Sequence, residues 1–285
     1  MAQTARFREL MRRDGMVVAP GAYDCITARL IERAGYDAVY MTGAGTAATL
    51  GYPDFGLVTM TEMVDNARRI ATAVGIPVIA DADTGYGNEL NTVRTVREYE
   101  AAGVAGIHIE DQGFPKKCGH LDDKEIVPRA DWLAKIRAAA AALRNRDFMV
   151  IARTDARAVA GFDEAIGRAN EAIEAGADMA FVEAPQTQEE VARVPQLVRG
   201  PCLLNVVHGG KTPAIDLAEA ERMGYKLAIV PGLLIKNVVG ICEQMLGELA
   251  ATRRHPNPVR EMTVRETFQL WGADEWDSLR TRFRD

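Results

Sequence analysis

Residues 148–183 have the sequence FMVIARTDARAVAGFDEAIGRANEAIEAGADMAFVE, and this stretch decides the fold that we predict. Phe148–Arg153 is a short apolar run of the kind that forms a buried β-strand. Asp163–Ala175 has the periodicity of a helix, and Gly176 follows it directly, as in short loops that end a helix before a strand. Met179–Glu183 is a second strand-like run. The stretch therefore predicts one strand, helix and strand unit of an α/β fold.

The same alternation extends over most of the chain. Short apolar runs with strand character number eight: Met16–Pro20, Ala38–Thr42, Ile76–Asp81, Gly106–Glu110, Phe148–Arg153, Met179–Glu183, Cys202–Val206 and Leu227–Pro231. Stretches with helical periodicity lie between them: Met60–Val74, Leu90–Ala102, Arg129–Leu143, Asp163–Ala175, Gln188–Leu197 and Leu217–Met223. Eight such units favour a (β/α)8 TIM barrel over a doubly wound sheet, which rarely needs so many similar units.

The chain continues past the eighth unit. An apolar helix is expected over Leu233–Leu249, and a polar, proline-bearing link follows at Arg253–Pro258. The tail Thr263–Phe283 carries Phe, Leu and Trp side chains, which predicts that it docks on the barrel or on a neighbouring subunit. We therefore expect a barrel domain over residues 1–250 and a C-terminal helical extension over residues 251–285.

The composition indicates a globular protein. A chain of 285 residues, 48% of them hydrophobic, can fill one large core. Its net charge of -6, with acids and bases interspersed, argues against a nucleic-acid surface. No run approaches the roughly 20 apolar residues of a membrane span, and the N-terminus has charges where a signal peptide needs an apolar core. We expect a cytoplasmic protein whose four cysteines, which form no CxxC pair, are free thiols.

Polar residues stand at the ends of most predicted strands. In order along the chain they are Tyr40, Thr42, Asp81, Asp83, Glu110, Asp111, Arg153, Asp155, Glu183 and Asn205. Enzymes with this architecture build their active sites at the carboxyl ends of the barrel strands. So many polar strand ends are not expected if those ends serve packing alone, and they predict an active site there.

Asp81 and Asp83 occupy alternate positions at a strand end, so both carboxylates can point to the same side. That arrangement suits a hard divalent cation, Mg²⁺ or else Mn²⁺, with water and substrate oxygens completing its shell. The alternative is that the two aspartates cap turns around Gly85 and Gly87. Glu110 at the end of the next strand favours the metal.

The loop Lys116-Lys117-Cys118-Gly119-His120 allows three interpretations. A zinc site lacks two local ligands. A basic surface loop with an incidental cysteine is the plainest alternative, because free cysteines are usually small buried hydrophobes. The third is a thiol that acts as acid or base, with its pKa lowered by the neighbouring cations.

Two glycine-rich stretches are candidate anion sites. Thr42–Ala48 superficially matches a dinucleotide fingerprint, but Gly51-Tyr52-Pro53-Asp54 breaks the helix that the fingerprint requires. We prefer a turn whose backbone N–H groups bind a carboxylate or phosphate. His208–Pro213 either binds an anion through its glycines and lysine or is only a turn.

Together these motifs resemble the isocitrate lyase / phosphoenolpyruvate mutase superfamily over about the first 235 residues. The matching segments are 40–45, 51–54, 81–87, 108–112, 116–120, 152–156, 183–185, and Asn205 with 210–213. The Lys-Lys-Cys-Gly-His segment is the most specific, because phosphonate mutases and hydrolases of this superfamily lack it. The resemblance is to the branch of methylisocitrate lyase, 2,3-dimethylmalate lyase and oxaloacetate hydrolase, which includes petal-death-like proteins.

The resemblance implies a role for each matching residue. Asp83 would bind Mg²⁺ directly, with Asp81 and Glu110 acting through water. Cys118 would be the acid of a carbon–carbon lyase, on one loop with Lys116 and His120, and Tyr40 is the candidate helper base. The substrate-binding set would comprise Thr42, Gly43, Ala44, Asp54, Arg153, Asn205 and Thr212. The turn at Thr42–Ala44 would hold a substrate carboxylate, and Arg153, Glu183 and Asn205 would fix the rest of the substrate. Arg153 and Glu183 would also belong to the catalytic group, with Cys118, Tyr40, His120 and Lys116.

The implied reaction is Mg²⁺-dependent cleavage of a substituted malate or a 2-methylisocitrate-like 2-hydroxy acid. The products would be a 2-oxo acid, pyruvate or glyoxylate, and a carboxylic acid. Hydrolysis or decarboxylation of oxaloacetate, phosphonate chemistry, and a non-catalytic binding protein are the alternatives. The resemblance also implies a homotetramer, a dimer of dimers, that exchanges its C-terminal helices.

Two departures bear on the substrate. Methylisocitrate lyases carry Asn-x-x-Glu-Phe-Gly where this chain has Asn205–Gly210, and Pro-Leu-Ser-x-x-Arg where it has Pro231–Lys236. The missing serine and arginine argue against a tricarboxylate. His208 also stands where the dimethylmalate lyase branch usually has glutamate.

Overall fold

The computed structural model describes residues 2–284 and contains a closed barrel of parallel strands in chain order. The strands are β1 (Val17–Ala22), β2 (Val39–Met41), β3 (Val78–Asp81), β4 (Gly106–Glu110), β5 (Met149–Thr154), β6 (Met179–Val182), β7 (Cys202–Asn205) and β8 (Leu227–Val230). Pairing of β8 with β1 closes the ring. The predicted (β/α)8 barrel is confirmed, and every predicted strand is present.

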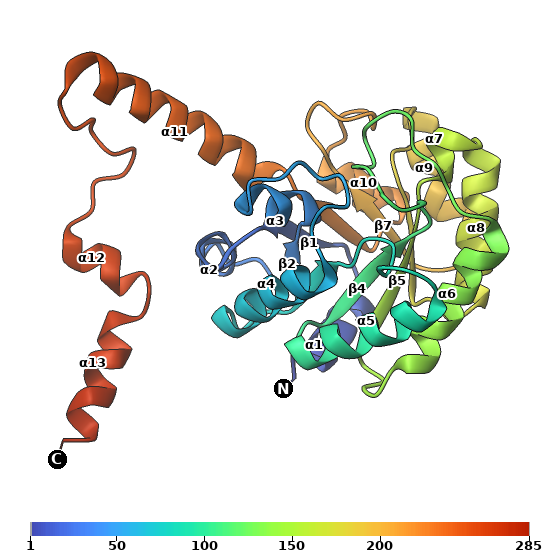
Figure 1. Cartoon of the computed structure of the whole chain (residues 1–285), viewed down its shortest axis with the longest axis horizontal. Helices are drawn as coiled ribbons and strands as arrows, with labels where there is room; N and C mark the ends of the chain where they lie inside the picture. The colour runs from blue at the N-terminus through green and yellow to red at the C-terminus, as the bar shows by residue number, and fades with distance from the viewer. Residues whose placement is uncertain (1, 285) are drawn as a thin grey trace. The chain divides into compact units, whose positions relative to one another are not determined.

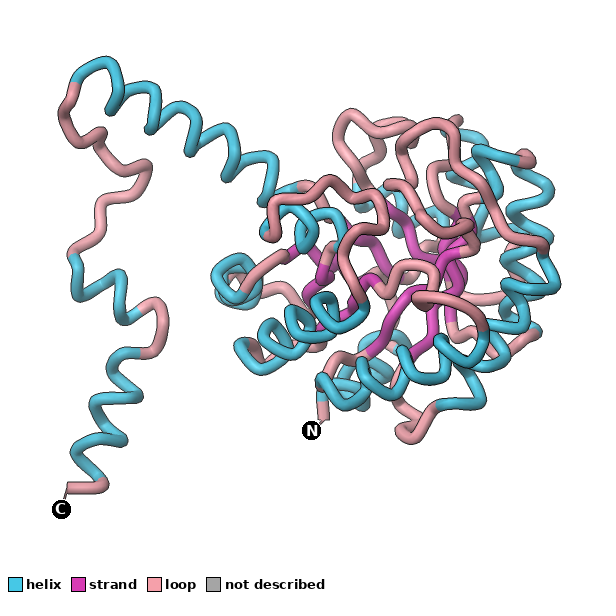
Figure 2. The backbone as a smooth tube through the Cα atoms, viewed as in Figure 1, coloured by secondary structure: helices cyan, strands magenta, loops and turns pink. Residues whose placement is uncertain are grey.

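Helices surround the strands on the outside (Figures 1 and 2). They are α1 (Gln3–Arg12), α2 (Cys25–Arg33), α3 (Gly43–Thr49), α4 (Met60–Ala73), α5 (Glu89–Ala102), α6 (Arg129–Ala142), α7 (Ala156–Val159), α8 (Phe162–Glu174), α9 (Gln188–Leu197) and α10 (Leu217–Met223). The six predicted helices are confirmed, whereas α1, α2, α3 and α7 are additional to them. Their ends follow local rules: Thr59 and Asn88 cap α4 and α5, and α5 stops at Gly103, whose backbone is left-handed.

The apolar core has two layers. One layer fills the barrel, where Ile79, Phe181 and Leu203 pack with Phe7 and Leu10 of α1. The second layer lies between the strands and the outer helices. Side chains of α1 belong to this interior cluster, so α1 closes one end of the barrel with apolar contacts. Function is therefore expected at the carboxyl ends of the strands.

The described chain divides into two compact units, one that ends at Lys236 and one that begins at Asn237. The division falls inside α11 (Leu233–Thr252), and α12 (Val264–Gln269) and α13 (Ala273–Arg282) follow. The predicted domain boundary at residue 250 stays a prediction. In α11, α12 and α13 no side chain is buried within the single chain that the structure describes, although Phe268 and Trp276 are large and apolar.

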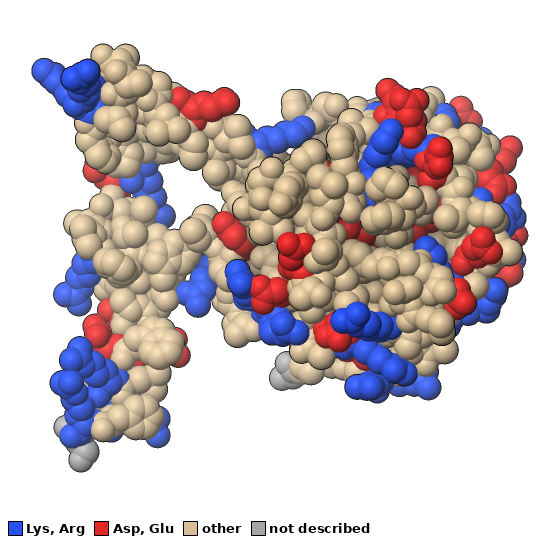
Figure 3. All heavy atoms as spheres, viewed as in Figure 1, with Lys and Arg blue, Asp and Glu red and all other residues tan. Residues whose placement is uncertain are grey.

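The surface of the barrel carries both signs of charge. Figure 3 shows Lys and Arg interspersed with Asp and Glu over the face of the barrel that it presents. Within residues 2–284, no helix combines the length and the apolar composition that crossing a membrane requires.

Candidate active site

A cavity of about 360 Å³ opens at the carboxyl ends of the strands. Ten of the predicted site residues line it: Tyr40, Thr42, Ala44, Asp54, Asp81, Cys118, His120, Arg153, Glu183 and Asn205. Gly43 and Asp83 line a smaller space that also touches Asp54. Lys116, Glu110 and Thr212 are buried. The barrel thus brings together residues that are far apart in the sequence.

Asp81 and Asp83 lie close together at the end of β3. The Asp83 amide donates to Oδ1 of Asp81 at 2.9 Å, and the backbone of Asp83 is left-handed, with φ of 45°. The Lys116 ammonium group reaches both this pair and the loop after α3, at 2.7 Å from Oδ1 of Asp83 and 2.5 Å from Oδ1 of Asp54. The aspartates therefore face a cationic partner rather than only capping turns.

Glu110 is the best indicator of a cation site. Its Oε1 is buried and has no protein partner, whereas Oε2 lies 3.2 Å from the Arg153 guanidinium. Burial raises the pKa of Glu110 well above its ordinary value, because Arg153 only partly offsets the loss of water. A buried carboxylate oxygen without a partner, next to the strand that ends in Asp81 and Asp83, fits a divalent cation.

The carboxylates do not enclose an ion by themselves. Among residues 2–284 no group of three or more His, Cys, Asp or Glu side chains has the arrangement that could hold a metal. Mg²⁺ does not require such a cage, because it usually keeps several waters and binds through one or two carboxylates plus substrate oxygens. The site therefore fits Mg²⁺ or Mn²⁺ with a partly aqueous shell, and it does not fit a closed zinc site.

The hydroxyl of Tyr40 contacts a buried histidine, His108. This hydroxyl lies 2.8 Å from Nε2 of His108 and 3.5 Å from Oδ2 of Asp81. Burial, together with the charge of Asp81, raises the pKa of Tyr40 well above its ordinary value, so the hydroxyl keeps its proton. Burial lowers the pKa of His108 to about 4, which leaves the ring neutral. The role of Tyr40 as helper base stays a prediction.

Arg153 connects three strand ends. Its guanidinium lies 3.2 Å from Glu110, 3.0 Å from Asp155 and 3.5 Å from Glu183. Glu110 and Arg153 are register partners on β4 and β5, which places their side chains on one face of the sheet. Because these three carboxylates surround the planar guanidinium, they hold the Arg153 side chain in one orientation.

Glu183 is held by Arg153, His120 and Asn205. The His120 ring lies 3.0 Å from Oε1 of Glu183, and the Asn205 amide donates to Oε2 at 3.1 Å. Although burial opposes it, the charges of Arg153 and His120 lower the pKa of Glu183, so the carboxylate is ionised. Oδ1 of Asn205 and Oγ1 of Thr212 have no protein partner, and we expect such buried polar atoms to meet a ligand or water.

Cys118 lies on a long excursion after β4, residues 112–126, which we call the Cys118 loop. A backbone bridge between Gln112 and Ile126 closes its base. Gly119 lies directly against Arg153 and Glu183: an added Cβ would stand 2.4 Å from Nη2 of Arg153. Only glycine allows this approach, and it carries the neighbouring thiol into the wall of the cavity.

The predicted lowering of the Cys118 pKa is wrong. Burial is the largest influence and raises the pKa of the thiol, and the nearby charges of Asp54 and Glu183 add to it. The adjacent lysines do not offset this, because Lys116 pairs with Asp54 and Asp83 while Lys117 donates to the Asp123 carbonyl. Cys118 is therefore protonated near neutral pH, which suits a proton donor.

The turn after β2 has the predicted form. α3 is a short helix that starts at Gly43, and the Thr42 hydroxyl accepts from the Gly45 amide. Gly43 approaches Asp81 so closely that an added Cβ would stand 2.4 Å from Oδ2. The helix stops at Thr49, before Gly51, as the break in the fingerprint predicted. The dinucleotide interpretation is therefore not favoured, and binding of a small anion at this turn stays a prediction.

The far end of the cavity is mainly apolar. Leu121, Val207, Pro231 and Ile235 contribute to its wall. The Lys236 ammonium group also reaches it, but donates to the His208 carbonyl at 2.6 Å. This end was not part of the predicted site, and its signal in the sequence was the apolar Leu-Leu-Ile before Lys236.

Three other residues at the site had no role assigned to them from the sequence. His108 supports Tyr40, Asp155 pairs with Arg153, and Lys124 pairs with Asp155 at 2.7 Å. A histidine inside an apolar strand run was a visible signal for His108, and Asp155 stood among the polar strand ends. Lys124 had no signal beyond its charge, since its pairing depends on the folded loop.

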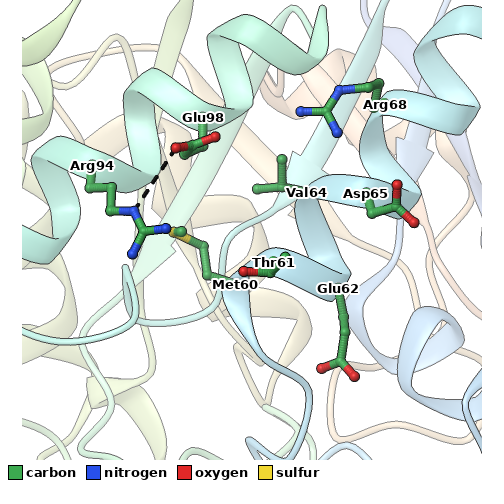
Figure 4. A pocket seen from close by; sticks show the side chains of 8 residues that line it. All are labelled: Met60, Thr61, Glu62, Val64, Asp65, Arg68, Arg94 and Glu98. Carbon is green, nitrogen blue, oxygen red and sulfur yellow. Dashed lines mark ion pairs between the residues drawn. The ribbon is translucent and has the colours of Figure 1, made fainter.

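A second pocket, of about 350 Å³, lies between α4 and α5 (Figure 4). Its side chains include Asp65, Arg68, Arg94 and Glu98, and Arg94 pairs with Glu98 at 3.9 Å. With Glu62, the lining carries three acidic and two basic side chains on the outer helices, and it includes no residue of the predicted site. The strand-end cavity is therefore the candidate active site.

Comparison with known proteins identifies the family of the chain. The family described as phosphoenolpyruvate phosphomutase matches residues 7–250. A 2,3-dimethylmalate lyase from Eubacterium barkeri is 53% identical over 81% of this chain and 80% of its own length. A 2-methylisocitrate lyase from Aeropyrum pernix is 44% identical over 95% of this chain and 87% of its own length.

Solved structures agree with the sequence relatives. A crystal structure of 2,3-dimethylmalate lyase has a TM-score of 0.94 and 39% identity, and covers 99% of this chain and 95% of that one. A phosphonopyruvate hydrolase complex with oxalate and Mg²⁺ has a TM-score of 0.90 and 29% identity, with both chains fully covered.

Proposed function

The chain belongs to the phosphoenolpyruvate phosphomutase family of the isocitrate lyase superfamily, and from that premise we propose that it is a Mg²⁺-dependent carbon–carbon lyase. Its substrate is a malate with a small apolar substituent, cleaved to a 2-oxo acid and a carboxylic acid. The observation that carries this proposal is the Cys118 thiol in the wall of a cavity that Leu121, Val207 and Ile235 also line.

Asp83, Asp81 and Glu110 would hold the cation. When bound, Mg²⁺ supplies positive charge that favours loss of the proton from the substrate hydroxyl. The support for this site is the unpartnered Oε1 of Glu110, and the relative solved with oxalate and Mg²⁺. Mn²⁺ satisfies the same oxygen ligands.

Substrate binding uses the polar half of the cavity. The first amides of α3, at Gly43 and Ala44, receive the carboxylate next to the reacting carbon. Arg153 orients the reacting oxygens, because three carboxylates hold its guanidinium in one place. The second carboxyl group of the substrate binds near the unpartnered oxygens of Asn205 and Thr212. These oxygens contact it through a bridging water or through its proton when it is protonated.

The proton of the 2-hydroxyl passes to the Tyr40 oxygen while the proton of Tyr40 moves to Nε2 of His108, 2.8 Å away. Because the pKa of His108 is lowered, the ring holds this proton only transiently and releases it to solvent once the products leave. Tyr40 is never fully ionised in this relay, so its raised pKa is no obstacle. The C2–C3 bond then breaks, C2 becomes the carbonyl of the 2-oxo acid, and the electron pair is left on C3. Sγ of Cys118 gives its proton to C3, and the thiolate regains a proton from solvent.

The apolar far end selects the substrate. Leu121, Val207 and Ile235 offer no partner for a third carboxylate, and the Lys236 ammonium group is paired with a carbonyl. A buried carboxylate without a partner is costly, whereas a methyl group gains from contact with this wall. We therefore expect 2,3-dimethylmalate-like acids to be preferred over 2-methylisocitrate-like tricarboxylates.

The test is a substrate panel of 2,3-dimethylmalate, 2-methylisocitrate and oxaloacetate, each with Mg²⁺. Pyruvate release would be followed for the first two acids and oxalate release for the third. We expect kcat/KM for dimethylmalate to exceed that for methylisocitrate by roughly tenfold or more. Turnover of oxaloacetate alone would contradict the lyase and favour the hydrolase.

We also propose that the chain works as a homotetramer and exchanges its C-terminal helices between subunits. The support is that α11, α12 and α13 bury no side chain in the single described chain, and that Trp276 is 71% exposed. Sedimentation of the full chain should give the tetramer mass, and Trp276→Glu should lower it. The cytoplasm remains its proposed location, in keeping with four unpaired cysteines.

A further inference from the structure

Lys124 is a buried lysine that the proposed reaction does not use. Only 1% of its side chain is exposed. Its ammonium group donates to the carbonyl of Gly119 and lies 2.7 Å from Oδ1 of Asp155. A buried ammonium group needs such partners, and here they belong to two parts of the molecule, the Cys118 loop and the end of β5.

The position of Lys124 within the Cys118 loop is informative. It stands close to the base of the loop, where Gln112 bridges Ile126 and the Gly113 amide donates to the Glu125 carbonyl at 2.9 Å. Gly119 lies near the tip and directly follows Cys118. A side chain fixed at the base thus reaches the peptide beside the thiol.

Asp155 extends the connection to the centre of the site. Its carboxylate accepts from Nε of Arg153 at 3.0 Å, and its amide donates to Oδ1 of Asp111 at 2.8 Å. The carboxylate is fully buried and shared by two cations, Lys124 and Arg153. The thiol loop and the substrate-orienting arginine are therefore tied to one carboxylate.

We propose that Lys124 is a positioning residue: it bridges the Gly119 carbonyl to Asp155 and so holds Cys118 in the cavity in register with Arg153. The inference rests on the proposed function, because it assigns the thiol a proton to deliver. Lys124 touches no reacting atom. It acts by favouring the closed position of the loop, so its loss raises the population in which the thiol faces solvent.

The test uses Lys124→Met in the full chain, with two readouts. The first is the rate at which iodoacetamide alkylates Cys118, followed on its own peptide by mass spectrometry. The second is kcat and KM with the best acid of the panel. We expect alkylation to be roughly tenfold faster or more, and kcat to fall roughly 10- to 100-fold while KM changes less than about threefold. Lys124→Arg, which keeps the charge, should recover part of the protection.

Lys226→Met is the matched control, since the Lys226 ammonium group also donates to backbone carbonyls, those of Arg13 and Gly15, at the other end of the barrel. It should leave both readouts unchanged. If Lys124→Met does not fold, Lys124→Gln replaces it, with the same expected direction.

The outcomes separate this inference from the proposed function. Faster alkylation in a chain that cleaves none of the acids would support the positioning role and contradict the lyase. A lower unfolding temperature with unchanged alkylation and unchanged kcat would overturn the positioning role, because the ion pair would then be only structural.

Discussion

The strand ends and the Cys118 loop supply the two halves of the candidate site, and they are held by different forces. Asp81, Glu110 and Arg153 stand on or at the ends of β3, β4 and β5, whose backbones are fixed by the barrel. Cys118 and His120 depend instead on side-chain contacts across long gaps in sequence, such as Lys124 with Asp155. The strand-end half is fixed once the barrel has formed. The Cys118 loop, in contrast, must be held in place by ion pairs.

The difference follows from what each half has to do. A cation site needs its oxygens within narrow limits, which a closed barrel provides. A proton donor in a buried cavity must let substrate enter before it closes, and a loop held by a few polar contacts can do both. Substitutions at the strand ends should therefore abolish most of the catalysis. Substitutions in the Cys118 loop should instead change the fraction of molecules in which the loop is closed.

The largest effect is expected at the strand end, for Asp83→Asn. Asparagine tolerates the left-handed backbone of this position, so the fold should persist while the charge is lost. Losing several kcal/mol of charge stabilisation should lower kcat/KM by roughly 10³-fold. Binding of Mg²⁺ measured by calorimetry should weaken in parallel. Asp123→Asn, at another left-handed aspartate, is the control and should keep activity.

The next largest effect is expected for the thiol itself. Cys118→Ala removes the proposed proton donor and should lower kcat by roughly 10²- to 10⁴-fold. Mg²⁺ affinity should stay unchanged, because the strand-end carboxylates are untouched. If Cys118→Ala kept the kcat of the parent chain, another group would have to protonate C3. The Cys118 loop would then not supply the proton donor.

The pH dependence of alkylation should sharpen the comparison. Burial, with Asp54 and Glu183, raises the pKa of Cys118, while Arg153 and the His120 amide oppose this. A raised pKa leaves the thiol protonated at pH 8, so Cys118 should react more slowly than N-acetylcysteine. Its rate should still be rising with pH where that of the free thiol has levelled off. A rate profile centred below that of the free thiol would contradict the buried, protonated state.

The smallest effect is expected for the surface contact that joins the Cys118 loop to the loop after β7. Lys211 lies 2.5 Å from Asp122, whose side chain is 85% exposed. Exposed ion pairs contribute little because water and salt screen them, so Asp122→Asn should change kcat by less than about fivefold. Adding 0.5 M NaCl to the parent chain should produce a shift of similar size. A loss as large as that of Lys124→Met would mean that the exposed pair, not the buried one, holds the loop.

The sequence by itself determined the fold and the place of the site. Each of the eight strands is a short apolar run, and burial of such a run is a local property. Parallel strands end at one edge of a barrel, so residues such as Asp81, Glu110 and Arg153 had to converge once the alternation was recognised. The cysteine and its glycine also stood out, because their neighbours in sequence are unusual.

Only the tertiary structure decided which charges meet. Lys116 pairs with Asp54, 62 positions away, and Lys124 pairs with Asp155, 31 positions away. Sequence proximity suggested that the lysines lower the pKa of Cys118, whereas the folded loop turns them elsewhere and buries the thiol, which raises it. A pKa is set by the groups that surround a side chain in space and by the water it loses, and neither is encoded in its sequence neighbours.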